Sequence, residues 1–166
     1  MAKYSTSWTS LTMTATADTT TFANSVFCAV GSAAAASMIK ISEVYIGGES
    51  ASTSTPATIV VARDSTNGAT PSATGVRTAL TDAMGLAPTT APTGFTQATT
   101  NPQRSATSHL LHLSFNAYGG IVRWVASPDQ AITAATATAP SSEISISAIT
   151  AATAPVTSGH FLYEVV

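Results

Sequence analysis

The groups that could carry catalysis are scarce in this sequence, so their positions decide whether a catalytic site is possible. The 166 residues include three histidines and eight aspartates and glutamates, among abundant serine and threonine. A hydrolytic triad needs a nucleophile, a base and an orienting acid. His109 and His112 lie three apart in HLLHLSF, a strand pattern, so we expect them on opposite faces and not on one metal. His160 follows TSG, and we interpret it as a turn residue that begins the last strand.

Carboxylates could instead converge in pairs, as glycoside hydrolysis requires. The candidates are Asp18, Glu43, Glu49, Asp64, Asp82, Asp129, Glu143 and Glu164. Most lie in turn contexts, such as Asp64 in RDSTNG and Asp129 in SPDQ, whereas strand pattern flanks Glu43 and Glu164 on both sides. The glycine pairs in GGES and NAYGGIV lack the strand-to-helix context of a phosphate loop. We therefore expect no enzyme and no cofactor.

The segment IVRWVA places an arginine beside one of the two tryptophans. Strand alternation puts Trp124 on the core face and Arg123 on the other. There the guanidinium would seek a carboxylate, and we expect an ion pair with Glu43 or Glu164, within or between chains, in preference to a ligand site.

The segment KYSTSW carries two aromatic residues, Tyr4 and Trp8, among small polar ones. It is either an edge strand or an arm docked on a partner, because tryptophan and tyrosine are favoured interface anchors. The candidate interface residues are therefore Tyr4, Trp8, Arg104 and Arg123.

These residues must be positioned by short strands, because apolar residues recur with period two between clusters of Gly, Pro, Asn and Ser. We expect strands near 5–14 and at 21–30, 38–46, 57–63, 109–115, 120–126, 130–135, 142–149 and 160–166. In SEISISAI, the serines should form a wet face opposite the isoleucines. The segment GVRTALTDAMGLAP has Val76, Ala79, Leu80 and Ala83 at helical spacing, so a short helix is possible there.

About nine short strands favour an all-β fold, a β-sandwich or jelly-roll-like single domain spanning 1–166, with 1–10 as a possible N-terminal arm or edge strand. Long polar loops are expected at 47–56, 64–75 and 87–108. Loops of this length are uncommon unless they are functional or lie against a partner.

Composition excludes several classes of function. The chain has six Lys and Arg, eight Asp and Glu, and a net charge of -2, with no basic run that could neutralise successive phosphates, so we expect no nucleic acid partner. No apolar run is long enough to span a membrane, and the N-terminus lacks the apolar segment of a signal peptide. The single cysteine, Cys28, excludes an intrachain disulfide and a cysteine-based zinc cluster. We therefore expect synthesis in the cytoplasm and no membrane or metal partner.

Taken together, MIKISEVYIGGE, STSTPATIVVARDSTNG, VRWVASPDQAITAATA and the terminal GHFLYEVV resemble the capsid decoration (cement) proteins of tailed bacteriophages. The resemblance covers roughly 38–63 and 118–166, and RWVASPD is its most specific part. It implies a β-sandwich or jelly-roll subunit, often trimeric, on the outer surface of the virion. There it would clamp neighbouring major capsid proteins. The alternative is a carbohydrate-binding or adhesin-like module of a tail or surface structure, which would present a platform of exposed aromatic side chains.

Overall fold

The chain folds as antiparallel strands. The computed structural model describes residues 3–13, 20–21, 26–29, 38–51, 55–66, 78–79, 93–96, 101–104, 109–135, 143–150 and 153–165. Its strands are β1 (Lys3–Thr12), β2 (Val26–Ala29), β3 (Met38–Gly48), β4 (Pro56–Thr66), β5 (Thr78–Ala79), β6 (Thr93–Thr96), β7 (Gln103–Arg104), β8 (Leu111–Asn116), β9 (Ile121–Val125), β10 (Ile132–Ala135), β11 (Glu143–Thr150) and β12 (Val156–Val165). Within these ranges there is no helix, which confirms the all-β prediction.

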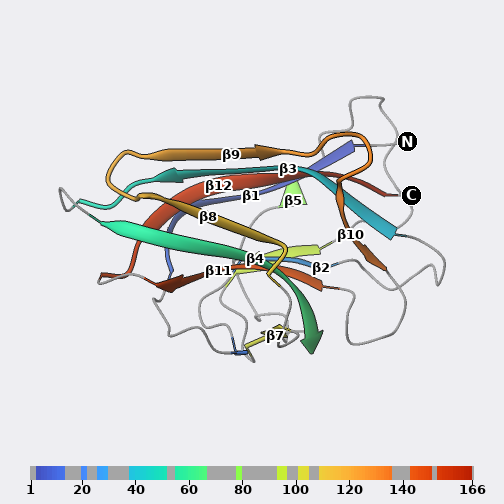
Figure 1. Ribbon diagram of the computed structural model, residues 1–166, viewed down its shortest axis with the longest axis horizontal. Coiled ribbons are helices and arrows are strands. Elements are labelled where there is room, and N and C mark those ends of the chain that lie inside the picture. The colour runs from blue at the N-terminus through green and yellow to red at the C-terminus, as the bar shows by residue number, and fades with distance from the viewer. Residues whose placement is uncertain are drawn as a thin grey trace.

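The strands form two sheets that pack face to face, so the predicted β-sandwich is confirmed (Figure 1). The first sheet has the order β10-β3-β12-β1-β5, and β9 also pairs with β3. The second sheet has the order β6-β2-β11-β4-β7, and β8 also pairs with β4. β10 and β9 share one edge of β3, because β10 pairs with Met38–Ile41 and β9 with Glu43–Gly47.

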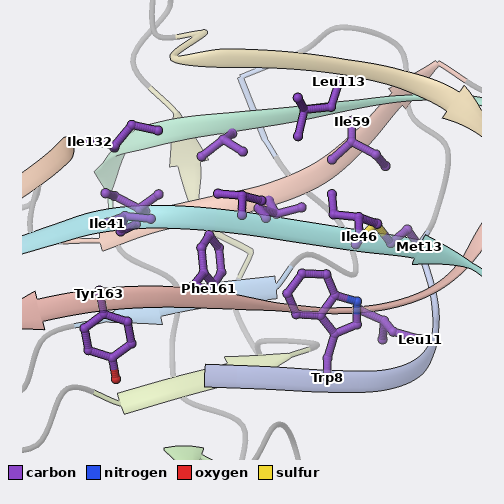
Figure 2. Close-up of a cluster of buried hydrophobic side chains, with 14 of the residues drawn as sticks. Trp8, Leu11, Met13, Ile41, Ile46, Ile59, Leu113, Ile132, Phe161 and Tyr163 are labelled. Carbon is purple, nitrogen blue, oxygen red and sulfur yellow. The ribbon is translucent and has the colours of Figure 1, made fainter. Parts of the chain in front are cut away.

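Strand alternation fills the space between the sheets with apolar side chains (Figure 2). The largest fully buried side chains are Tyr163, Phe161, Met13, Ile39, Ile41, Ile46, Ile59, Ile144 and Ile146. Trp8 lies beside Phe161 with ring centroids 5.9 Å apart in a tilted arrangement. Each such side chain contributes about 1.5–3 kcal/mol through burial, so this cluster is the main source of stability.

The N-terminal segment is an integral strand and not a detached arm. β1 pairs with β12 from Lys3–Glu164 to Thr12–Val156, and it also pairs with β5 at two residues. Trp8 is only 4% exposed, and its indole Nε1 donates to Thr157 Oγ1 at 3.2 Å. The docking-arm alternative is therefore wrong for Trp8, because its ring is buried in the core of its own chain.

The expected wet face of β11 is also wrong. Ser145 and Ser147 are fully buried, like the isoleucines on the opposite face. The Ser145 hydroxyl donates to the carboxylate of Asp64, which is itself fully buried in β4 rather than in a turn. Small hydroxyl side chains can be buried when they find such partners, so the polar alternation of SEISISAI did not indicate exposure.

Parts of the expected loops are strands. β6 and β7 lie within 87–108, and β4 extends to Thr66. The expected helix is contradicted at Thr78–Ala79, where β5 pairs with β1; its remaining residues lie outside the described ranges. No described helix is long and apolar enough to cross a membrane.

Candidate functional site

β9, β3 and β12 run side by side in the first sheet (Figure 1). The outer face of these strands carries an ion-paired cluster. Arg123 Nη2 lies 2.7 Å from Glu43 Oε2, which confirms the predicted ion pair, places it within one chain and identifies Glu43 as its carboxylate. On the other side, His160 Nε2 lies 3.2 Å from Glu43 Oε1. His160 lies well inside β12, so its interpretation as a turn residue is wrong.

The same cluster includes a stacked pair of rings. Tyr45 lies opposite both Arg123 and His160 in the strand register. Its ring stacks on the His160 imidazole with centroids 5.3 Å apart and planes 10° apart. One face of the tyrosine ring is therefore covered by the histidine.

The ionisable groups of this cluster stabilise one another's charged forms. The hydrogen bond from Arg123 is the main cause that lowers the pKa of Glu43, with a smaller contribution from His160, while burial of the carboxylate opposes both. Glu43 in turn raises the pKa of Arg123. Because Arg123 and His160 both contact Glu43, its carboxylate is paired within the chain and is not available to a charged ligand.

Apolar side chains on the same face are exposed. Ile121 is 64% and Val125 55% exposed, on either side of Arg123 in β9, and Leu162 in β12 is also exposed. On the inner face of β9, Val122 and Trp124 pack against the core as expected. β9 pairs only with β3 among the described strands, so its other edge is free of any strand that the structure describes. Exposed apolar residues beside an open edge are typical of an interaction surface.

A depression of about 430 Å³ lies at one end of this face, and Gly47 is among the residues that line it. In the register, Gly47 lies between Ile121 of β9 and Ser158 of β12. Tyr45 and Glu49 lie two residues before and after it on β3, so they face the same side. All five residues line the depression, which we call the Gly47 socket.

The turn between β8 and β9 forms one rim of the socket. Gly119 has a φ of +70°, which favours glycine, and a Cβ at Gly120 would lie 2.1 Å from the carbonyl oxygen of Asn116. Gly48 N donates to Gly120 O at 2.8 Å and ties the turn to β3. The glycine pair of NAYGGIV is therefore required by the turn itself.

Glu49 is fixed at the other rim by two hydroxyl groups. Ser10 Oγ donates to Glu49 Oε2 at 2.6 Å, and Ser158 Oγ donates to Oε1. These hydrogen bonds lower the pKa of Glu49, Ser10 contributing most. Ser10 lies in the bulge of β1 with a φ of 48°, a conformation that is strained for a residue with a side chain. Sequence reasoning missed this carboxylate because its hydroxyl partners are 39 and 109 residues away.

Of the other predicted interface residues, Arg104 is contradicted and Tyr4 stays untested. Arg104 is buried in β7 opposite Asp64, so it is not available to a partner. The backbone of Tyr4 pairs with that of Tyr163, and its side chain lies outside the described part.

The two neighbouring histidines differ from the prediction. His112 Nε2 lies 2.6 Å from His109 Nδ1, because β8 begins only at Leu111 and His109 does not follow its alternation. The rings therefore meet instead of pointing to opposite faces. In the described part of the chain, no group of three or more His, Cys, Asp or Glu residues could hold a metal ion.

No protein-family model, curated protein or solved structure matches this chain.

Proposed function

We propose that this protein decorates and stabilises the outer surface of a phage capsid by binding between major capsid proteins. The observation that carries the proposal is the outer face of the first sheet, where Ile121 and Val125 are more than half exposed beside an edge of β9 that no other described strand pairs with. Exposed apolar side chains can bury area against another protein, and Arg123 between them already has a carboxylate partner, Glu43, within the chain. The resemblance of RWVASPD and its flanking segments to decoration proteins points to the same role.

Repetition on a lattice would make such a face effective. A decoration protein binds in many copies, so individually weak contacts become strong through multivalency. A closed homo-oligomer, a trimer in the proposed case, would match a local threefold axis of the shell. In this proposal the protein resides on the virion surface, with itself and the major capsid protein as partners.

The carbohydrate-binding alternative has less support. Sugar rings stack on exposed aromatic faces, and among the described aromatic residues with large exposure there is only Tyr118, which is 50% exposed. Tyr45 has one face covered by His160. A single exposed ring at a turn is a poor platform for a polysaccharide.

Co-sedimentation tests the capsid proposal. The mass of the purified protein would be measured by light scattering, and the protein would then be sedimented with emptied, expanded tailed-phage heads. We expect a trimer that binds to saturation in a fixed ratio to the shell protein. The double variant I121D/V125D should lose binding, because it places charge on the docking face. The matched control S114D changes an exposed position on the outer face of β8 and should bind normally.

Two outcomes would contradict the proposal. Wild-type protein that stays in the supernatant would remove the capsid role, and binding of a polysaccharide by the same protein would favour the alternative. Equal sedimentation of I121D/V125D and wild type would show that this face is not the docking surface.

A further inference from the structure

Packing within the chain does not require a glycine at position 47, on the floor of the Gly47 socket. A Cβ at Gly48 or Gly159 would lie 2.2 Å from backbone atoms, so the packing demands glycine at these positions. A Cβ at Gly47 would meet nothing nearer than 3.9 Å, and the backbone there has no left-handed φ. A glycine between two paired strands weakens a sheet and often marks the close approach of a ligand or another chain. Gly47 therefore contributes no side chain to the floor of the socket, which is left to its backbone and the neighbouring Tyr45 ring.

The socket also holds a carboxylate, Glu49, that has no cationic partner among the described side chains. Glu49 is fixed by Ser10 and Ser158, and no Lys, Arg or His whose side chain the structure describes lies within ion-pair distance of it. By contrast, Glu43 on the same face is paired with Arg123 and His160. The charge complementary to the socket is therefore positive.

The walls fit the stem of a long basic side chain. Tyr45 leans over the floor, with its Cε1 and hydroxyl oxygen 4.0 Å from where a Cβ at Gly47 would be. Ile121 lies opposite Gly47 on β9 and is largely exposed. Lysine and arginine bury their methylene stems against such apolar surfaces, while the charged head finds a carboxylate or an aromatic ring.

We propose that the Gly47 socket receives a lysine or arginine side chain of a protein partner, with its stem along Tyr45 and Ile121 and its cationic head at Glu49. The head would donate charge-assisted hydrogen bonds to an acceptor that is already oriented. The inference goes beyond the proposed function, because the chemistry of this contact does not depend on whether the partner is a capsid protein.

The test uses single amino-acid probes and the full chain. Amide NMR spectra would be followed while Nα-acetyl-lysine methylamide or its arginine counterpart is added at constant ionic strength, with the norleucine analogue and methyl glucoside as comparison probes. We expect saturable shifts at Gly47 and Ser158 with the two basic probes only. E49Q, which removes the charge, and G47V, which fills the floor, should each weaken binding about tenfold or more. The control D129N removes an exposed carboxylate from a distant turn and should bind as wild type does.

Each alternative result overturns the inference in a recognisable way. Equal binding of norleucine would make the socket a purely apolar one, and preferential binding of methyl glucoside would make it a saccharide site. Unchanged binding by E49Q and G47V, with thermal unfolding showing both folded, would place the probe elsewhere. If the basic probes bind but heads do not, the capsid proposal fails alone. If heads bind E49Q and G47V as they bind wild type and the basic probes do not bind, the socket inference fails alone.

Discussion

Glu43 connects two neighbouring strands on the outer face of the first sheet, because its carboxylate accepts hydrogen bonds from both Arg123 and His160. Its side chain is 12% exposed, whereas that of Arg123 is 60% exposed. Solvent screens exposed ion pairs, so each contributes little to stability. R123M should therefore lower Tm only slightly. E43Q should lower it further, since it weakens two contacts of a mostly buried group. Calorimetry measures both, and an unchanged Tm in R123M would show that the pair contributes nothing to stability.

The two glutamates with lowered pKa predict how stability depends on pH. The pKa values of Glu43 and Glu49 are lower in the folded state than in the unfolded chain. The unfolded chain therefore binds more protons, so this contribution is complete above the ordinary glutamate pKa of about 4.3 and is lost as pH falls through the folded values. We expect Tm to fall when the pH is lowered from 6 to 3. The double variant E43Q/E49Q should show a smaller fall over the same range, and an equal slope would mean that other groups cause the acid sensitivity.

The ion pair of Arg123 could be predicted from the sequence because the chain has few charged residues. With 8% charged residues, an arginine between apolar strand neighbours had two plausible carboxylate partners, and one of them is observed. The Gly47 socket could not be predicted in the same way. Its floor is the absence of a side chain, and its carboxylate is fixed by hydroxyl groups from two distant strands.

At the level of elements, β12 can pack between β3 and β1 only because it has a glycine, Gly159, where the Trp8 ring of β1 lies against it. A Cβ at Gly159 would lie 2.2 Å from the carbonyl oxygen of Tyr45 and 2.5 Å from the ring of Trp8. Overpacking of a filled core costs about 1–3 kcal/mol, and backbone contact on one side limits the relief. G159A should therefore lower the free energy of unfolding by about 2 kcal/mol or more in denaturant titration. G47A on the adjacent strand adds the same methyl group at ordinary van der Waals distance from its neighbours, the nearest being 3.9 Å away, and should stay close to wild type. Equal losses in the two variants would contradict this difference.

β1 supplies both a strand and a core ring, so its removal should affect folding rather than docking alone. Deleting residues 2–9 removes most of the pairing with β12 together with Trp8. Loss of a buried tryptophan side chain alone costs about 3–5 kcal/mol. We expect the truncated chain to lose cooperative thermal unfolding, whereas W8F should unfold cooperatively at a reduced Tm. A truncated protein that unfolds like wild type would restore the docking-arm interpretation.

The strand pattern predicted the main elements because alternation reports a buried face directly. It could not report which outer faces are covered. Ser145 and Ser147 alternate with isoleucines as exposed residues would, yet both are fully buried. β5, β6 and β7 have two to four residues each, and such short strands have no periodicity to detect. These elements depend on tertiary pairing rather than on local sequence.

At the scale of the whole molecule, low charge predicts how assembly responds to salt. The net charge is -2, and the proposed docking face relies on apolar groups and at most one basic side chain from a partner at Glu49. A protein that neutralises 6–10 phosphates loses about 10³–10⁵ in affinity between 50 and 200 mM salt. One ion pair and apolar burial change far less, since salt screens charges but does not weaken burial. Binding to expanded heads should therefore fall less than about threefold over that range, as measured by co-sedimentation at a series of NaCl concentrations. A loss of a hundredfold or more would mean that electrostatic attraction to the shell, and not the outer face of the first sheet, dominates binding.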